Sequence, residues 1–215
     1  MQNIVLFGAG GLARETVQLI DDINRHKPSY RLLGFVVEEK YYKANSMVGG
    51  YPVLGTEEWI IANKDNVVCT CAIGFPEPRA RIQKALQAQG VRFESLISPD
   101  TRIRDSSVVG KGCIILNSSI SVDCSIGDGV LLNGDIGMGH DVSIGNYTCI
   151  MQGTKISGWI SIGEEVFIGG NSYIVPKRKI GDHAVVAAGS VVFTNVKPNT
   201  TVLGNPAKRI PSLED

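Results

Sequence analysis

The sequence has no charge excess, no long apolar run, no paired-cysteine motif and few histidines. Its 21 basic and 21 acidic side chains give a net charge of zero. That balance argues against nucleic acid or another polyanion as the main partner, because such proteins carry a basic excess. No stretch reaches the roughly 18 consecutive apolar residues of a membrane span. The first segment, MQNIVLFGAGG, has neither the basic flank nor the cleavage site of a signal peptide.

The cysteines and histidines narrow the chemistry further. The five cysteines, an odd number, form no CxxC motif. We therefore expect free thiols in a reducing, cytoplasmic compartment and no metal site. Only three histidines are available for acid–base catalysis. Apolar residues are abundant, at 43% of the chain, and there are 25 glycines, so the chain can build a core and is not disordered.

Residues 1–98 have the pattern of an α/β domain. The predicted elements are, in chain order, a strand at 3–7, a helix at 12–20, strands at 32–37 and 67–73, and a helix at 79–89. Strands that alternate with helices across short loops predict a parallel sheet with crossover helices. This length leaves room for one half of a Rossmann fold and not for a complete dinucleotide-binding domain.

Residues 99–215 follow a different pattern, with a period of six. Twelve aliphatic residues share one frame: Ile126, Leu132, Met138, Ile144, Ile150, Ile156, Ile162, Ile168, Ile174, Ile180, Val186 and Val192. The residues four positions after them are small, β-branched or apolar, except Arg178. This period predicts a parallel β-helix in which three hexapeptides form one triangular coil. The aliphatic residue points inward, and the glycine that often follows it lets the chain turn the corner.

The sequence leaves the register of the first coils and the handedness of the β-helix open. An earlier block, Ile103, Val109 and Ile115, runs one residue out of frame, which a one-residue slip between coils would absorb. General chirality rules favour right-handed coils.

A glycine-rich loop follows the first predicted strand. Gly8, Gly10 and Gly11 allow a tight turn and a close approach to a ligand, and the helix that begins at Leu12 offers free N–H groups to an anion. The loop suits the pyrophosphate of a nucleotide sugar. The spacing G-x-G-x-x-A also fits a nicotinamide dinucleotide, which we disfavour because only half of a Rossmann fold is present.

Other candidate ligand contacts come after the second and third predicted strands. Open parallel sheets bind ligands at the carboxyl ends of their strands. Gly74, after the third strand, would let the backbone pass close to the ligand. Glu38 and Glu39, after the second, could accept hydrogen bonds from uridine or ribose, or form a solvated charge pair.

Five motifs together resemble a known family. They are Phe7–Glu15, Ala72–Gly74 followed by Arg79, Leu132-Asn133, Gly139–Asp141 and Gly204–Lys208. In this order, over essentially the whole chain, they resemble the bacterial nucleotide-sugar acetyltransferases. That group includes sialic-acid O-acetyltransferases and bacillosamine- and perosamine-type N-acetyltransferases. The resemblance implies a left-handed β-helix, a homotrimer, acetyl-CoA as co-substrate and a nucleotide-linked amino sugar as acceptor.

The catalytic prediction falls on one histidine. Acetyl transfer needs a group that removes a proton from the nucleophile. His26 lies in a polar linker and His183 at a β-helix corner, whereas His140 lies at a corner and is followed by Asp141. A neighbouring carboxylate fixes the imidazole tautomer and raises its basicity. With the family resemblance, this pattern predicts His140 as general base, assisted by Asp141.

The resemblance also implies residues around the two substrates. Gly158, Gly170 and Ala188 match positions that line the coenzyme groove between subunits, and the amide of Gly158 would stabilise the oxyanion. Cys149 falls where some relatives have a second histidine that contacts the coenzyme or acetyl group, and with no adjacent base it is disfavoured as a nucleophile. In the C-terminal tail, Lys208 could meet the coenzyme phosphates. Asn133 would hydrogen-bond the sugar.

The sequence therefore predicts an acetyl-CoA-dependent N-acetyltransferase that acts on the amino group of a nucleotide-linked 4-amino-4,6-dideoxy sugar by direct transfer. Acetylation of a sugar hydroxyl is the alternative within the class. Outside it, the alternatives are a non-catalytic nucleotide-sugar-binding protein and a small NAD-binding oxidoreductase.

Overall fold

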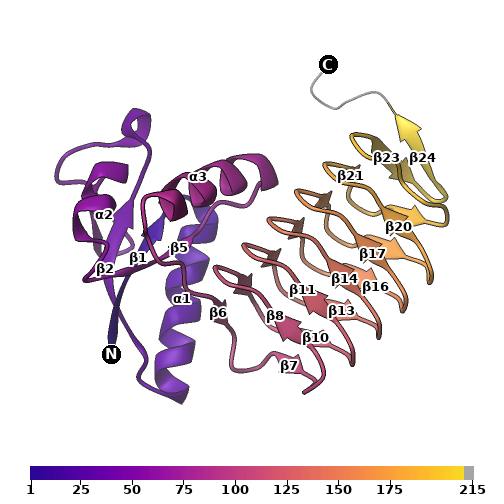
Figure 1. The fold of residues 1–215 in the computed structure, drawn as a ribbon, viewed down its shortest axis with the longest axis horizontal. Coiled ribbons are helices and arrows are strands. Elements are labelled where there is room, and N and C mark those ends of the chain that lie inside the picture. The colour runs from indigo at the N-terminus through magenta and orange to yellow at the C-terminus, as the bar shows by residue number, and fades with distance from the viewer. Residues whose placement is uncertain (211–215) are drawn as a thin grey trace.

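The computed structural model describes residues 1–210, which form an α/β domain followed by a β-helix (Figure 1). The α/β domain contains one five-stranded sheet in the order β3-β4-β2-β1-β5. Its strands are β1 (Gln2–Phe7), β2 (Tyr30–Val36), β3 (Met47–Val48), β4 (Tyr51–Gly55) and β5 (Val68–Cys71). Its helices are α1 (Gly11–His26), α2 (Glu57–Asn63), α3 (Pro76–Ala88) and the 3₁₀ helix η1 (Glu39–Tyr41). Among the described residues, no helix is both long and apolar enough to span a bilayer.

Helices cover both faces of this sheet. Side chains point alternately to the two faces along β1, so its residues pack into two separate cores. Ile4 and Leu6 belong to a core that includes α1 and reaches the β-helix, whereas Val5 and Phe7 belong to a core with α2 and α3. Helix α1 therefore lies between the sheet and the β-helix. The parallel pairing of β1 with β2 and β5 confirms the predicted parallel arrangement.

The sequence prediction of this domain was incomplete in two respects. It missed β3, β4 and α2, which are short, and β4 contains proline and glycine, which obscure a strand pattern. It also placed His26 in a polar linker, which is wrong, because α1 continues to His26. The polar residues of its last turns form the exposed side of the helix.

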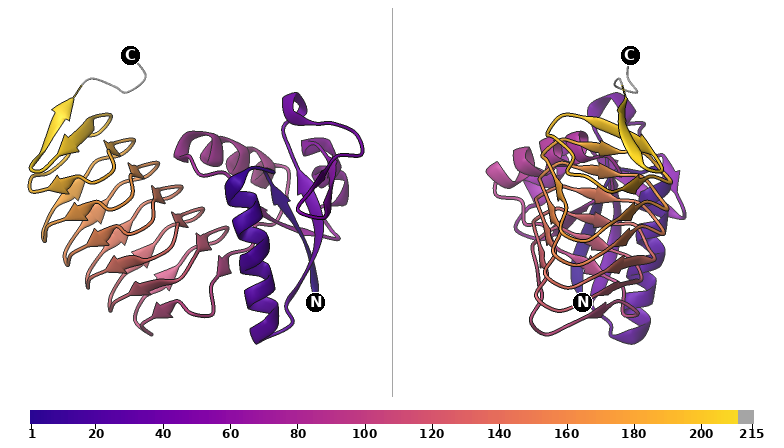
Figure 2. Two further views of the ribbon diagram at one scale, coloured as in Figure 1. Left: turned by 180° about the vertical axis from the view of Figure 1, so that it is seen from behind. Right: turned by 90° about the vertical axis from the view of Figure 1, so that its right-hand side faces the viewer.

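The β-helix contains three sheets, parallel except for a C-terminal hairpin, which we call sheets I, II and III in the order the chain visits them (Figure 2). Sheet I contains β6 (Leu96–Ile97), β9 (Ile114–Ile115), β12 (Leu131–Leu132), β15 (Cys149–Ile150), β18 (Phe167–Ile168), β21 (Val185–Val186) and the hairpin β23 (Thr201–Gly204) and β24 (Ala207–Ile210). Sheet II contains β7 (Arg102–Ile103), β10 (Ser118–Ile120), β13 (Ile136–Met138), β16 (Lys155–Ile156), β19 (Tyr173–Ile174) and β22 (Val191–Val192). Sheet III contains β8 (Val108–Val109), β11 (Ser125–Ile126), β14 (Ser143–Ile144), β17 (Ser161–Ile162) and β20 (Lys179–Ile180).

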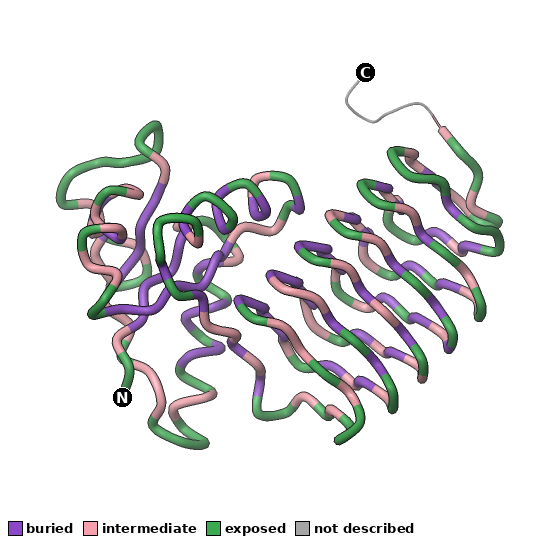
Figure 3. The backbone as a smooth tube through the Cα atoms, in the orientation of Figure 1, coloured by how far each residue is buried: buried purple, intermediate pink, exposed green. Residues whose placement is uncertain are grey.

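The predicted period of six is confirmed by burial. All twelve aliphatic residues of the repeat are at most 5% exposed, and buried positions recur in every coil (Figure 3). The residues four positions later are buried as well, with Arg178 only half-buried. The frame slip lies between Ile115 and Ile120: Ile120 pairs with Ile103, 17 positions earlier, whereas Met138 pairs with Ile120, 18 positions earlier.

The coils are left-handed, as the family resemblance implied, so the right-handed expectation was wrong. That expectation comes from helical crossovers over twisted sheets, whereas these coils join flat strands of two or three residues. Every sixth residue instead adopts a left-handed backbone conformation, with φ between 50° and 79°: Asp123, Gly129, Asp135, Asp141, Tyr147, Gly153, Trp159, Glu165, Asn171, Lys177, His183 and Gly189.

The glycines after the aliphatic residues have a different role from the one predicted. None of Gly127, Gly145, Gly163, Gly169 and Gly181 has a positive φ, so they are not the residues that turn the corners. A Cβ at Gly145 would lie 2.5 Å from the backbone nitrogen of Glu164 on the next coil. These glycines are required because adjacent coils stack too closely for a side chain.

This close stacking predicts that Gly145→Ala is destabilising by about 1–3 kcal/mol, because the added methyl group overpacks rigid backbone. Gly137→Ala is the matched control, since its Cβ would meet only the flexible side chain of Lys155. Thermal unfolding of the two variants at one protein concentration measures the difference. Equal transition temperatures for the two variants would contradict the stacking explanation.

A buried cation, Arg79, joins the two domains. Arg79 of α3 is fully buried and donates hydrogen bonds to the backbone carbonyls of Cys71 and Ile73 in the α/β domain. It also donates to the carbonyls of Gly112 and Gly129 in the β-helix. Arg79 thus satisfies carbonyl groups on both sides of the junction, a role that the sequence did not indicate.

Candidate active site

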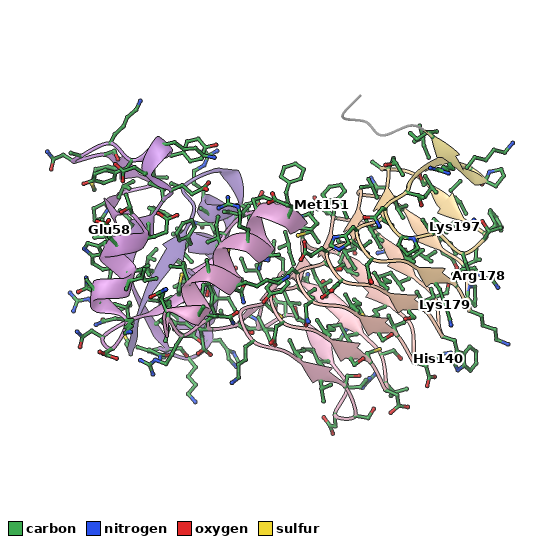
Figure 4. The ribbon with its side chains drawn as sticks, turned by 45° about the horizontal axis from the view of Figure 1, so that its top comes forward. Glu58, His140, Met151, Arg178, Lys179 and Lys197 are labelled. Carbon is green, nitrogen blue, oxygen red and sulfur yellow. The ribbon has the colours of Figure 1, made fainter. Side chains whose placement is uncertain are left out.

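His140 stands on an exposed corner of the β-helix. It follows β13 of sheet II and precedes β14 of sheet III, and Figure 4 shows it at the outer edge, far from Met151 beside the α/β domain. Its Nδ1 lies 2.7 Å from Oδ2 of Asp141, and the two side chains are 42% and 45% exposed. Asp141 occupies Nδ1, so Nε2 stays available to a substrate. The structure therefore brings together the pair that the sequence singled out.

The next coil provides the surroundings of this imidazole. Gly158 is buried under the ring, where a Cβ would lie 2.7 Å from Cε1 and Nε2 of His140. The ring of Trp159 packs edge-on against the imidazole. Gly158 was predicted to lie near the coenzyme, whereas Trp159 was not predicted. Residues 18 positions apart occupy the same place on successive coils, and Trp159 lies 18 positions after Asp141, the neighbour of His140.

The other two histidines lie elsewhere. His183 is at the corner between sheets III and I, where its Nδ1 lies 3.7 Å from Oε2 of Glu165. Glu165 also accepts a 2.7 Å hydrogen bond from Lys84 of α3, so His183 belongs to an ion cluster at the domain junction. His26 is the exposed last residue of α1.

The predicted nucleotide-sugar residues meet at the carboxyl edge of the α/β sheet. Gly10 precedes α1 and no side chain caps the helix, so its first N–H groups are free for an anion. A Cβ at Gly10 or Gly11 would have no neighbour within 4 Å. A Cβ at Gly74 would lie 3.9 Å from the side chain of Leu12, which joins the loop after β5 to the first turn of α1. Gly8 differs, because its φ of 105° and its position against the Ala72 carbonyl make it necessary for the backbone.

The two glutamates after β2 have separate environments. Glu38 accepts a 2.7 Å hydrogen bond from Arg81 of α3, and Lys40 lies 3.5 Å away. Burial acts to raise the pKa of Glu38, but Arg81 and then Lys40 outweigh it and lower the pKa below its ordinary value. Glu39 is exposed in η1. Glu38 is therefore an ionised carboxylate held in an ion pair at this edge.

The remaining predicted residues lie on a different edge of the prism from His140. Asn133, Gly170 and Ala188 are at the corner between sheets I and II, where the amide of Asn133 lies 3.9 Å from the sulfur of Met151. His140 and Gly158 are at the corner between sheets II and III. Lys208 is exposed on β24, in the hairpin at the far end of the β-helix. One prism alone does not bring these groups to one place.

Cys149 does not fit the predicted coenzyme site. It lies on β15 of sheet I, fully buried in the core shared with the α/β domain. Burial raises the pKa of its thiol to about 12, partly offset by the charge of Arg79. The expectation that Cys149 contacts the coenzyme was wrong, because its side chain reaches no surface of this chain.

The same burial predicts that the folded protein does not react with a thiol reagent near neutral pH. All five cysteines are free and buried, and burial raises the pKa of the Cys69, Cys71 and Cys113 thiols as well. Reaction with 5,5′-dithiobis(2-nitrobenzoic acid) should release almost no chromophore from native protein and a full equivalent per cysteine in denaturant. A fast native equivalent would contradict this structure.

Family models match segments of both domains. Residues 3–86 match the PglD N-terminal domain, and residues 160–194 match the bacterial transferase hexapeptide (six repeats). One relative, the GDP-perosamine N-acetyltransferase of Escherichia coli O157:H7, is 30% identical over 201 residues, covering 93% of this chain and 81% of the relative.

Solved structures are similar over nearly the whole chain. The acetyltransferase domain of PglB from Neisseria gonorrhoeae FA1090, in complex with acetyl coenzyme A, is 25% identical, with a TM-score of 0.87 over 97% of this chain and 99% of that one. A variant of perosamine N-acetyltransferase from Caulobacter crescentus, in complex with CoA and GDP-perosamine, has a TM-score of 0.90 at 22% identity over 99% of this chain and 98% of that one. The latter likeness is one of fold.

Proposed function

This chain belongs to the nucleotide-sugar acetyltransferases that combine a PglD N-terminal domain with hexapeptide repeats, and we propose that it transfers the acetyl group of acetyl-CoA to the amino group of a nucleotide-linked 4-amino-4,6-dideoxy sugar. The observation that carries the proposal is the His140–Asp141 pair, held at an open corner over the backbone of Gly158. Such a pair is suited to remove a proton from an attacking amine.

The α/β domain would hold the nucleotide sugar. The pyrophosphate would lie at the first turn of α1, against Gly10, Gly11 and Leu12, where free N–H groups and open space coincide. Gly74 leaves room on one side of this position, and Glu38 and Glu39 lie on the other, after β2. The sheet order places β1 between β2 and β5, so the ligand would lie across the carboxyl end of β1, between these two sets of residues.

In the proposed reaction, the sugar nitrogen attacks the thioester carbonyl while Nε2 of His140 takes its proton. Asp141 keeps the Nδ1 proton in place and stabilises the imidazolium. The N–H of Gly158 has no acceptor within residues 1–210, so it is available to the oxyanion. The carbon–sulfur bond then breaks, and the proton on His140 passes to the departing thiolate. We expect transfer to be direct, since the buried thiol of Cys149 cannot act as an acyl acceptor.

The active enzyme would be a homotrimer with acetyl-CoA between neighbouring prisms. The base lies on the edge between sheets II and III, whereas Gly170, Ala188 and Asn133 lie on the edge between sheets I and II. A neighbouring copy can bring one edge against the other, because a cyclic assembly pairs different surfaces of identical subunits.

The shared-site arrangement predicts complementation between two inactive variants. His140→Ala removes the base, and Ala188→Trp blocks the other edge at an exposed position. In mixed assemblies, roughly a quarter of the sites receive both intact edges, so co-expressed variants should regain a corresponding part of the activity. Activity of differently tagged, co-purified variants measures this. No recovery in verified mixed assemblies would place the whole site within one chain.

The proposed reaction is tested by thiol release from acetyl-CoA with UDP-, dTDP- and GDP-linked 4-amino-4,6-dideoxy sugars, with the matching 4-hydroxy sugars as controls. We expect release with an amino sugar and a mass change of one acetyl group on that sugar. Release with the hydroxy sugar alone would show an O-acetyltransferase. Binding of NAD without binding of acetyl-CoA would overturn the proposal.

A further inference from the structure

Trp159 packs directly on the proposed base and takes no part in the proposed proton transfer. Its ring centroid lies 4.4 Å from that of His140, with the planes 89° apart. Its backbone N–H also donates a 3.0 Å hydrogen bond to the carbonyl of His140. Trp159 is therefore tied to His140 through both its side chain and its backbone.

The backbone conformation of Trp159 is unfavourable for a bulky side chain. Its φ of 56° is left-handed, a conformation that suits glycine, asparagine and aspartate and strains bulky residues. The indole is 54% exposed, so little burial offsets that strain. Tyr147, an aromatic residue in the same conformation, is only 6% exposed and packs beside Lys84 of α3. Contacts within the chain thus offset the strain at Tyr147 and do so much less at Trp159.

Three groups surround the imidazole of His140. Asp141 holds Nδ1, the backbone of Gly158 closes the side below Cε1 and Nε2, and Trp159 closes another side. The indole is itself restrained, because the ammonium of Lys177 on the next coil lies 5.3 Å from the Trp159 ring. Without the indole, the half-exposed imidazole could turn about its side-chain bonds.

We infer that Trp159 is a positioning residue, which fixes the His140 imidazole so that Nε2 faces the acceptor amine, with Lys177 steadying the indole. The inference rests on the proposed function of His140 as base. Proton transfer depends on hydrogen-bonding geometry, and a displacement of about 1 Å can cost on the order of a hundredfold in rate.

Steady-state kinetics of Trp159→Ala provide the first test. We expect kcat to fall by about 10–100-fold, with KM for both substrates changed less than about twofold. Trp159→Phe keeps an aromatic edge and should restore most of kcat. Phe193→Ala is the matched control, since Phe193 is an exposed aromatic residue on the same edge and is expected to keep kcat. Unchanged kcat in Trp159→Ala would overturn the inference.

A double variant separates positioning from direct substrate contact. If Trp159 acts only through His140, then adding Trp159→Ala to His140→Ala should lower the residual rate no further. A further drop, or a rise in KM for acetyl-CoA, would mean that the indole binds substrate and would overturn the inference. If His140→Ala alone kept its turnover, the proposed base would be wrong, which is a separate result. Should Trp159→Ala fail to fold, Trp159→Leu gives the same comparison with more apolar bulk.

Discussion

Replacing His140 with alanine is expected to lower kcat by about 10²–10⁴-fold while the fold stays intact. This is the usual contribution of a general base and corresponds to about 3–5 kcal/mol in the activation barrier. The fold should tolerate the change, since the side chain is 42% exposed and, within residues 1–210, hydrogen-bonds only to Asp141. Thiol release under saturating substrates measures the effect, and thermal unfolding verifies the fold.

His183→Ala is the matched control for this experiment. His183 is a corner histidine of similar exposure, also beside an acidic residue, but on a different edge. We expect it to retain near-normal kcat. Asp141→Asn should fall between the two, because an amide can still orient the imidazole but no longer stabilises its protonated form. Equal loss in His140→Ala and His183→Ala would point to a structural effect, and full turnover of His140→Ala would exclude it as the base.

Arg79→Ala is expected to destabilise the protein by roughly 3–5 kcal/mol, the loss typical when one partner of a buried charged network is removed. The guanidinium is completely buried, and the four carbonyls that it satisfies belong to both domains. Without it, those carbonyls lose their donors inside the junction. For a chain of this length, the transition temperature should fall by roughly 10 °C.

Arg81→Ala gives the comparison for this prediction. Arg81 is two residues further along α3 and half-exposed, and it pairs with Glu38 at the surface. Such pairs contribute about 0–1 kcal/mol, so its variant should unfold close to the wild-type temperature. Both variants must be measured at one protein concentration, because subunit assembly contributes to apparent stability. Similar transitions for the two variants would mean that Arg79 does not hold the domains together.

The β-helix was predictable from sequence to an unusual degree. A residue at one position of a hexapeptide always faces the same way, so Ile126 and its eleven successors could be assigned to the interior from spacing alone. The same count places Gly158 one coil beyond His140, and Ala188 one coil beyond Gly170. The spacing therefore implies that these two pairs lie on different edges of the prism, but this follows only after the strands have been assigned to the three sheets.

The corner glycines illustrate where spacing was misleading. Ile144-Gly145 marks a corner correctly, yet the conformation that turns the chain belongs to residues such as Asp141 and Tyr147. Gly145 is required by the distance to the next coil. The repeat shows at which position glycine recurs. It does not show whether glycine is needed there for a positive φ or because a neighbouring coil leaves no room for a side chain.

By itself, the sequence determined the repeat, the glycine loop at the start of α1 and the His140–Asp141 pair, because each depends on residues close together in the chain or on a strict period. Tertiary structure alone decided the burial of Cys149, the four carbonyls around Arg79 and the packing of Trp159 on His140. Those contacts depend on how the two domains dock and on how side chains of neighbouring coils pack, which the spacing does not give. The physical reason is that local preferences act through a residue's own backbone, whereas burial and ring packing depend on which distant atoms occupy the neighbouring space.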